Sequence, residues 1–151
     1  MYKSQYKIGV VFIMLLCFLG INTRCTNTDK NIPWDILPAN SKYFINTYLG
    51  GYTVQSISED NNSYDVLFTN GMDVLFYKES GDWAQVTYNK GVPQAIFNLL
   101  PQKAQQNIND GYYQWFATVI GRNKNYFFVT LNNGVKITYD TEGNYIKQEN
   151  V

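Results

Sequence analysis

The sequence predicts an α+β domain of two tandem units, each a helix, a loop and a second helix followed by a four-stranded antiparallel meander. The segment YDVLFTNGMDVLF at residues 64–76 returns at residues 127–139 as FFVTLNNGVKITY. Both copies alternate apolar and polar residues around an Asn-Gly pair, which is typical of half-buried hairpin strands. A stretch with a helical apolar stripe precedes each copy. We therefore expect the helices to pack on one face of the sheet.

The chain begins with a segment typical of a secretory signal peptide. Lys3 and Lys7 precede the run IGVVFIMLLCFLGI at residues 8–21, which is almost wholly apolar. A bilayer-spanning helix needs roughly 20 apolar residues, and this run is shorter. A basic start followed by an apolar core of this length indicates export. We expect residues 1–25 to be the signal and residues 26–31 to be a short linker.

A lipid anchor is one of several fates that this signal leaves open. Cys25 follows the apolar run, at the place where a bacterial lipoprotein carries its acylated cysteine. Arg24 precedes it where such a site has a small residue, and Leu16 precedes the other cysteine, Cys17. No A-x-A-like cleavage site is present either. Periplasmic, surface-anchored and secreted forms all remain open, and we expect membrane contact only through this segment.

Composition excludes several kinds of partner. No cysteine follows residue 25, so the folded domain forms no disulfide and depends on core burial for its stability. Setting aside Lys3, Lys7 and Arg24 leaves nine basic residues against twelve acidic ones, a net charge near −3. A nucleic-acid surface needs a clustered basic patch, so we expect no nucleic-acid partner.

Composition also excludes most catalytic sites. The chain has no histidine, which excludes Ser-His-Asp and Cys-His catalysis, and both cysteines lie in or beside the signal, which excludes a zinc–thiolate site. Asp65 and Asp73 lie on neighbouring predicted strands and could form a carboxylate pair, but no basic partner accompanies them. The segment DTEGN at residues 140–144 has only a faint likeness to a calcium loop, and we expect a hairpin turn there. We therefore expect no enzymatic activity, cofactor or metal.

The repeat extends beyond the hairpin. At a shift of 63 residues the matching pairs are Leu37-Pro38 with Leu100-Pro101, Ile45 with Ile108, Ile57 with Ile120, and Asn70-Gly71 with Asn133-Gly134. After the hairpin one residue is lost, and Gly81-Asp82-Trp83 matches Gly143-Asn144-Tyr145 at a shift of 62. Two copies of one supersecondary unit explain this order. We expect one domain over residues 32–151, with repeats at about 32–90 and 91–150.

The helices are predicted at the start of each unit. Residues 38–49 place apolar side chains on one stripe, with Pro38 in the first turn and Gly50-Gly51 as the stop. Residues 32–37 supply a short helix before it. In the second unit, residues 92–100 form the corresponding stripe up to Pro101, and a weaker helix follows to about Ile108.

Four strands follow the helices of each unit. Alternation places them at about 52–58, 64–69, 72–78 and 83–88, then at 113–121, 125–132, 135–140 and 144–149. A two-residue turn at Asn-Gly would put the apolar residues of paired strands on opposite faces. A three-residue loop with a left-handed glycine, at residues 69–71 and 132–134, restores one apolar face. We expect that face to bury Val66, Phe68, Val74, Phe76, Val129, Leu131 and Ile137 under the helices.

The opposite face of the sheet is mixed in character. It carries Thr130 and Thr138 beside the candidate contacts Asp65, Leu67, Asp73, Leu75, Tyr77, Phe128, Lys136 and Asp140. One face of an antiparallel sheet is often solvated, and apolar anchors surrounded by charges suit a moderately polar protein interface. This face is therefore the predicted binding surface.

The hairpin motifs resemble a known family. The pattern Y-x-V-x-F-x-N-G, then V-x-F and G-x-W, is met by Tyr64, Val66, Phe68, Asn70-Gly71, Val74, Phe76, Gly81 and Trp83. The second copy has Phe127, Val129, Leu131, Asn133-Gly134, Ile137, Tyr139-Asp140 and Gly143. This duplicated order, over roughly residues 32–150, resembles the β-lactamase-inhibitor-like, PepSY-like domains of exported Bacteroidetes proteins.

The resemblance implies tandem units of helices and a four-stranded meander, together with export. The inhibitors that give the family its name grip β-lactamases with a concave sheet and hairpin loops. They carry disulfides, which residues 26–151 cannot form, and their active-site-filling residues have no counterpart here. No functional residue is therefore carried over from the family to this chain.

Two functions remain as expectations. The first is a non-enzymatic envelope module that binds or inhibits a protein of the cell envelope or exterior through its open sheet face and hairpin loops. The second is a small-ligand or glycan binder that uses exposed aromatic side chains. Tyr77, Tyr88, Tyr113 and Phe128 are the aromatic residues expected to make such contacts.

Overall fold

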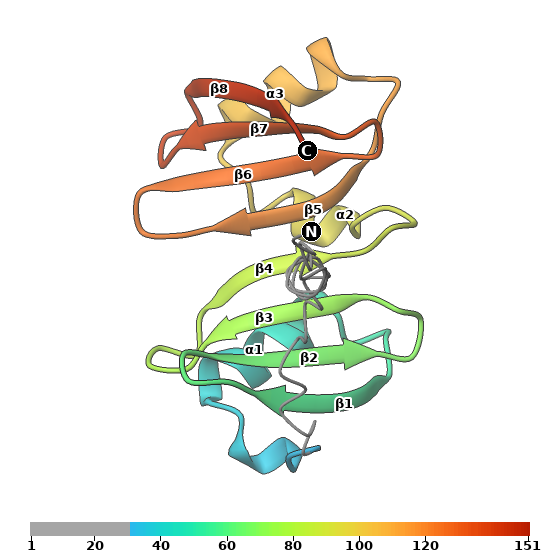
Figure 1. Ribbon diagram of the computed structural model, residues 1–151, viewed down its shortest axis with the longest axis vertical. Coiled ribbons are helices and arrows are strands. Elements are labelled where there is room, and N and C mark those ends of the chain that lie inside the picture. The colour runs from blue at the N-terminus through green and yellow to red at the C-terminus, as the bar shows by residue number, and fades with distance from the viewer. Residues whose placement is uncertain (1–30) are drawn as a thin grey trace, which may run out of the picture.

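All eight strands form a single antiparallel sheet in the order β1-β2-β3-β4-β5-β6-β7-β8, so each strand pairs with its neighbours in the chain (Figure 1). The computed structural model describes residues 31–151. The predicted signal and the Cys25 anchor therefore lie outside the described residues. Of the predicted linker, only Asn31 lies within them. Within those residues, no helix is long and apolar enough to cross a bilayer.

The helices precede the strands in each half of the chain. The first half has η1 (Trp34–Ile36), α1 (Ala39–Tyr48), β1 (Val54–Glu59), β2 (Ser63–Phe68), β3 (Asp73–Tyr77) and β4 (Trp83–Thr87). The second half has α2 (Gln94–Phe97), α3 (Gln102–Gly111), β5 (Ala117–Arg122), β6 (Tyr126–Leu131), β7 (Val135–Asp140) and β8 (Tyr145–Asn150). Figure 1 shows the helices behind one face of the sheet, which leaves the other face open.

Helix α1 follows the predicted stripe. Pro38 precedes its first residue, where the missing N–H costs no hydrogen bond. Phe44 and Ile45 are buried on its inner side, and the Leu49 side chain just after its end is buried as well. The Ser41 hydroxyl donates a hydrogen bond of 2.8 Å to the Gly81 carbonyl, which ties the helix to the β3–β4 loop.

The helices of the second half differ from the prediction in length. The stripe at residues 92–100 forms an α-helix only over Gln94–Phe97, while the segment expected to be weaker forms the ten-residue helix α3. Val92 instead donates its N–H to Ala117. Pro101 disfavours helical geometry at the residue before it, and it opens the next helix. The break is therefore at Pro101, as predicted, but α2 ends before it, at Phe97.

Strand β5 begins later than predicted. Residues 113–116 form a loop, in which Trp115 donates its N–H to Tyr112 and Phe116 pairs its backbone with Asn132. In this loop Tyr113 is 75% exposed and Trp115 is 44% exposed. The alternation Tyr-Gln-Trp-Phe at residues 113–116 predicted a strand. In the structure these residues form the turn that follows α3, and β5 begins at Ala117.

The two predicted three-residue loops are confirmed. Gly71 has φ of 87° and Gly134 has φ of 84°, both in the left-handed region that favours glycine. The register pairs Val66 with Val74 in the first hairpin and Val129 with Ile137 in the second. Both hairpins therefore present one continuous row of buried apolar residues to the helix side of the sheet, as predicted.

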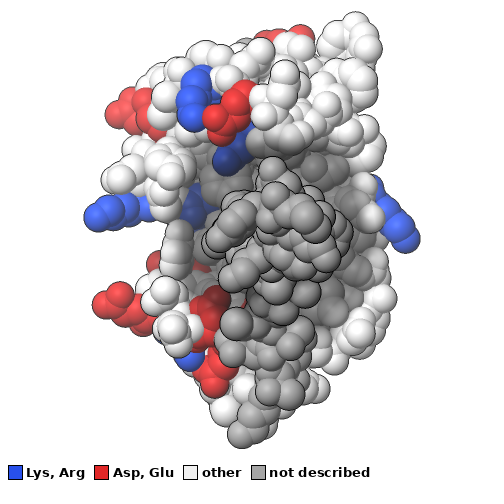
Figure 2. Space-filling model, viewed as in Figure 1, with Lys and Arg blue, Asp and Glu red and all other residues white. Residues whose placement is uncertain are grey.

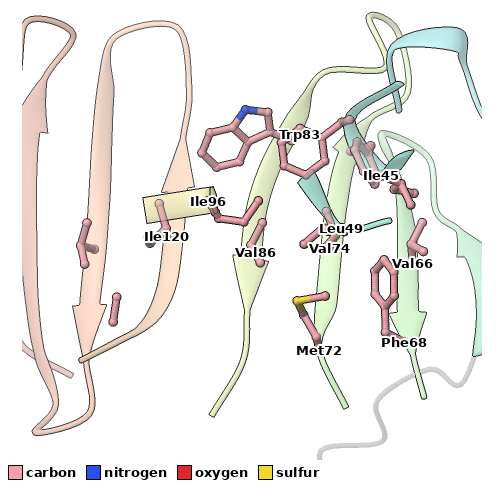
Figure 3. Close-up of a cluster of buried hydrophobic side chains, with 14 of the residues drawn as sticks. Ile45, Leu49, Val66, Phe68, Met72, Val74, Trp83, Val86, Ile96 and Ile120 are labelled. Carbon is pink, nitrogen blue, oxygen red and sulfur yellow. The ribbon is translucent and has the colours of Figure 1, made fainter. Parts of the chain in front are cut away.

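The seven core residues predicted from that register are all buried. Aromatic rings join the helix to the sheet, since Phe44 stacks on Trp83 with ring centroids 5.6 Å apart. Figure 3 shows Ile96 of α2 reaching the sheet between Val86 of β4 and Ile120 of β5. Strands β4 and β5 also pair through Val86 and Ile120, so the core is continuous between the two halves.

The irregularities of the sheet recur at the spacing of the sequence repeat. Register shifts at Val54/Ser56 and Leu75/Phe76 return at Ala117/Val119 and Thr138/Tyr139. The loop glycines recur too. A Cβ atom on Gly81 would lie 2.5 Å from Pro38, and one on Gly143 would lie 2.8 Å from Pro101. In each half, a loop glycine thus rests against the proline that opens a helix.

Candidate functional site

The face opposite the helices, here called the open face, is built from two rows of side chains that cross all eight strands. Strand pairing aligns one row as Ser58, Asp65, Leu75, Gln85, Gly121, Phe128, Thr138 and Lys147. It aligns the other as Ser56, Leu67, Asp73, Thr87, Val119, Thr130, Lys136 and Glu149. Six of the eight predicted contact residues lie in these rows. The other two, Tyr77 and Asp140, lie beside them at the ends of β3 and β7.

Charge on the open face is confined to its two ends. Asp65 and Asp73 lie on β2 and β3, while the charged residues of the other end lie on β7 and β8. Strands β4, β5 and β6 contribute only neutral positions to the rows, namely Gln85, Thr87, Val119, Gly121, Phe128 and Thr130. A neutral centre between charged ends matches the anatomy of protein interfaces, whose centres are depleted of charge.

Phe128 forms the middle of this neutral centre. Its ring lies flat across Gly121 on the neighbouring strand, since a Cβ atom there would come within 2.1 Å of the ring. The Lys136 ammonium lies 5.0 Å from the ring centroid, and the same ammonium is 3.7 Å from the Glu149 carboxylate. Phe128 is therefore held against the sheet by its neighbours, and it is only half-buried.

A hollow of about 1000 Å³, here called the loop-edge hollow, lies where the β1–β2, β3–β4 and β5–β6 loops meet. Its lining includes Asn62, Tyr77, Lys78, Arg122, Lys124 and Phe127. The Tyr77 hydroxyl donates a 3.0 Å hydrogen bond to the Arg122 carbonyl and so joins the two halves. Figure 2 shows charged side chains gathered on the left of the view, the edge where these loops lie in Figure 1.

Two of the three cations in the loop-edge hollow are engaged by nearby acids. Lys78 lies 2.6 Å from Glu59, and Arg122 lies 3.8 Å from Asp82. The Arg122 guanidinium also stacks over the Trp83 ring at 5.1 Å. These pairs are partly exposed, so each contributes little to stability. They do fix the positions of the side chains that line the hollow.

Asp65 and Asp73 are brought together on the open face, as the sequence predicted. Burial raises the pKa of Asp73 to about 7, and the hydrogen bond and negative charge of Asp65 add to this shift. Both carboxylates line a second hollow of about 160 Å³, which Asn31, Ser56 and Ser58 also line. Sequence alone did not show this hollow, because it depends on Asn31 folding over β1.

Asp140 is the predicted contact residue with the least freedom to meet a partner. One of its carboxylate oxygens accepts hydrogen bonds from the N–H groups of Glu142 and Asn144, and the other accepts one from the Asn144 side chain. The side-chain bond from Asn144 is the main cause of its lowered pKa. The segment at residues 140–144 is therefore the predicted hairpin turn between β7 and β8.

The loop-edge hollow is the part of the site that sequence reasoning missed. We predicted turns at each of its three loops but did not join them into one surface. In a meander, alternate turns lie on the same edge of the sheet, so the strand order could have indicated it. Of the other predicted aromatic contacts, Tyr113 is exposed and Tyr88 is half-buried.

Comparison with protein families gives two overlapping matches. A family model described as "Putative beta-lactamase-inhibitor-like, PepSY-like" matches residues 22–79 and residues 62–147. No curated protein matches the chain.

Three solved structures are similar to most of the chain. One from Bacteroides vulgatus, a "putative periplasmic protein" of the DUF2874 family, is 30% identical with a TM-score of 0.72, and the match covers 83% of this chain and 99% of that one. A "putative calcium-regulated periplasmic protein" from Bacteroides thetaiotaomicron is 30% identical with a TM-score of 0.71, covering 81% and 97%. A second Bacteroides vulgatus protein, described as periplasmic and of unknown function, is 26% identical with a TM-score of 0.66, covering 76% and 92%.

Proposed function

This chain belongs to the beta-lactamase-inhibitor-like, PepSY-like family, as its hairpin motifs predicted, and we propose that it is an exported, non-enzymatic module of the cell envelope that binds a protein. The binding surface in this proposal is the open face together with the loop-edge hollow. The observation that carries it is the neutral centre of the open face, which spans β4, β5 and β6 between two charged ends.

The energetics of the fold support the open face as the binding surface. The apolar residues of the opposite face are already buried against the helices, so they cannot anchor a partner without unfolding. On the open face, Leu67, Leu75 and Phe128 are half-buried and Tyr77 is 38% exposed. Aromatic and apolar anchors of this kind carry most of the free energy of protein binding.

Composition supports a non-enzymatic role. The chain has no histidine, and no cysteine follows residue 25. The carboxylates of Asp60 and Asp140 accept hydrogen bonds in turns, which occupies them as acid–base groups. Asp65 and Asp73 form a pair, but the described part of the chain places no basic side chain beside them. A general acid–base site would need such a partner to position a reacting group.

The relatives support a periplasmic location. All three structures described above are of proteins described as periplasmic, and the basic and apolar start of this chain is typical of export. In this proposal the folded domain begins near residue 32 and faces the periplasm, with the surface and the exterior as the other destinations of an exported chain.

We further propose that residues 32–90 and 91–150 are two copies of one unit. The sequence repeat, the recurrence of helices followed by four strands, and the matching glycine–proline contacts of Gly81 and Gly143 support this. Pairing of β4 with β5 would then extend one copy of the open face into the other.

Calcium response is a narrower part of the proposal. The Bacteroides thetaiotaomicron relative is described as calcium-regulated, and we extend that property to this chain. Within residues 31–151, no three carboxylate, thiol or imidazole groups converge. A calcium site in this part of the chain must therefore combine two carboxylates with neutral oxygen atoms, which calcium accepts as ligands.

Immobilised protein and extracts of the native cell envelope test the binding proposal. Tyr77→Ala and Lys136→Glu alter an anchor and a charge of the open face, and each should weaken capture of the partner by about tenfold or more without lowering the melting temperature by more than a few degrees. Tyr43→Ala is the matched control, because Tyr43 is 67% exposed on α1, on the helix side. Equal capture by all four proteins would contradict the proposal.

A glycan is the alternative ligand, and the loop-edge hollow favours it. Tyr77 and Phe127 offer ring faces there, and Asn61, Asn62 and Asn125 offer side-chain amides that can bind sugar hydroxyls. A glycan array distinguishes the two ligands. Binding of a defined glycan that Tyr77→Ala abolishes, with no protein captured, would replace the protein-binding proposal.

A further inference from the structure

The two edges of the sheet differ in whether their backbone groups are occupied. At the β1 edge, the Ile57 carbonyl accepts a 2.8 Å hydrogen bond from the Ile32 N–H, and the Ile57 N–H donates a 3.0 Å hydrogen bond to the Asn31 side chain. At the other edge, β8 has no strand beyond it among the described residues (Figure 1). A free row of N–H and C=O groups is a template for the addition of another strand. The β8 edge is therefore the one that is open to a partner.

The sequence repeat shows what the corresponding edge binds in the first half of the chain. At the shift of 62 residues, Gln148 of β8 corresponds to Val86 of β4. Val86 pairs with Ile120 of β5, and the Tyr88 N–H two residues later donates to the Thr118 carbonyl, so the backbone groups of Val86 face β5. Strand β8 therefore repeats β4 without the strand that pairs with β4.

Hydrogen bonds to β7 show which backbone groups of β8 point outward. The Val151 N–H donates a 2.9 Å hydrogen bond to the Gly134 carbonyl, just before β7. The direction of the N–H groups alternates along a strand, so the Glu149 N–H also faces β7. The backbone groups of Gln148 and Asn150 then point away from β7, as the correspondence with Val86 indicates.

The charged side chains of β8 are complementary to a second copy of the same strand. Lys147 and Glu149 follow each other on the open face, and their side chains are 56% and 40% exposed. If two β8 strands pair antiparallel with Gln148 opposite Gln148, outward backbone groups meet and each Lys147 faces a Glu149. A shift of two residues in either direction would place lysine opposite lysine or glutamate opposite glutamate, which is destabilising. A shift of one residue would join outward backbone groups to inward ones.

We infer that two copies of this chain form a two-fold symmetric dimer through β8, in which the two sheets join edge to edge. Gln148 lies on the symmetry axis and exchanges both backbone hydrogen bonds with the partner's Gln148. Ile146, which is 52% exposed, becomes covered in part by the partner strand. The dimer closes on itself, because pairing of β8 with β1 of another copy would have to displace residues 31 and 32 from Ile57. The two open faces then lie side by side on the same face of one sheet.

The dimer should be weak, because the pairing involves a single short strand of each copy. Stable interfaces bury roughly 1,600 Å² in total, and one strand pair buries much less. We expect a dissociation constant on the order of 10⁻⁴ M, in the range of transient assemblies. Sedimentation velocity from about 10 μM to about 1 mM brackets this value. Wild type, purified after export, should change from monomer to dimer over that range.

Charge reversals test the register. Lys147→Glu and Glu149→Lys should each weaken the dimer by about fivefold or more, since the symmetry brings like charges together twice. The double variant with both reversals restores each opposite-charge pair, so it should associate within about twofold of wild type. Lys90→Glu is the matched control, because Lys90 is exposed in the turn after β4 and the change in net charge is the same. It should associate like wild type.

Gln148→Pro separates strand pairing from folding. The Gln148 N–H faces away from β7, and edge strands tolerate proline at such positions. The variant should lose the dimer and keep a melting temperature within a few degrees of wild type, measured by circular dichroism. In wild type, amide exchange at Gln148 and Asn150 should slow as the concentration rises. Exchange at Glu149, whose N–H faces β7, should change little.

Two results would overturn the inference. Wild type that stays monomeric up to about 1 mM would show that β8 does not pair with itself at the expected strength. A dimer that the single charge reversals and Gln148→Pro leave as strong as wild type would place the interface elsewhere on the molecule. Neither result bears on the binding of an envelope protein by the open face, which a monomer can perform.

Discussion

At the residue scale, the environment of each aspartate decides its role. Asp60 accepts hydrogen bonds from the N–H groups of Asn62 and Ser63, which lower its pKa and stabilise a turn. Asp73 has no such donors, and burial beside Asp65 raises its pKa. The sequence correctly placed Asp60 in a turn and Asp73 on a strand. It did not predict that their pKa values shift in opposite directions. The difference depends on how deeply each carboxylate is buried, which residue spacing does not reveal.

The raised pKa of Asp73 predicts a specific dependence of stability on pH. Its unfolded-state pKa is 3.8 and its folded-state pKa is about 7, so the folded protein binds more protons between these values. Protonated Asp73 therefore contributes its full stability to the folded state below pH 3.8. That contribution is lost as the pH rises through 7, because the partly buried carboxyl then ionises. Asp73→Asn should therefore match wild type at pH 4 and exceed it by about 1–2 kcal/mol at pH 8, a value reduced for partial exposure.

Urea denaturation in a chelating buffer, at both pH values, measures this difference. The chelator removes calcium, so the proposed calcium response does not enter the comparison. Asp60 and Asp140 lose their stabilising hydrogen bonds only below about pH 4, and they do so equally in both proteins. A difference between variant and wild type that is the same at pH 4 and pH 8 would contradict the raised pKa.

At the scale of the elements, hairpins were more predictable than helices. Alternation and the Asn-Gly pairs determined the register of both central hairpins, because a slip of one residue would expose the apolar face. Helix lengths depended on packing and on prolines, which the apolar stripe does not report. The helix predicted over residues 92–100 is therefore longer than α2, and the one predicted over residues 101–108 is shorter than α3. The exposed loop at residues 113–116 was mistaken for strand because its pattern alternates by chance.

The contact between a loop glycine and a helix-opening proline predicts matched costs in the two halves. In Gly81→Ala the new Cβ atom would meet Pro38 at 2.5 Å, and φ of 71° is unfavourable for alanine. Overlap and backbone strain together should destabilise the protein by about 2–4 kcal/mol. Gly143→Ala, facing Pro101, should cost a similar amount.

Gly51→Ala is the control for these glycine variants. A Cβ atom at Gly51 would meet nothing within 4 Å, so the change should stay within about 0.5 kcal/mol of wild type. Chemical denaturation of the three variants compares them directly. If Gly81→Ala were as stable as Gly51→Ala, the helix and the β3–β4 loop could not pack as closely as the structure shows.

At the scale of the whole molecule, pairing of β4 with β5 makes one sheet with two unlike faces. One face is sealed by helices over a continuous core, and the other has a neutral centre and charged ends. The sequence predicted both faces, while the pairing of β4 with β5 comes from the structure. The sequence did not predict the loop-edge hollow, which exists because three loops from both halves meet along one edge.

Photo-crosslinking in native cells tests most directly whether the open face is the binding surface. A photoreactive phenylalanine analogue replaces Tyr77 or Gln85 on the open face, or Tyr43 on α1 as the exposed control. The account predicts that the same envelope protein is crosslinked from positions 77 and 85 and is not crosslinked from position 43. Crosslinking of that protein from position 43 alone, or equally from all three positions, would contradict it.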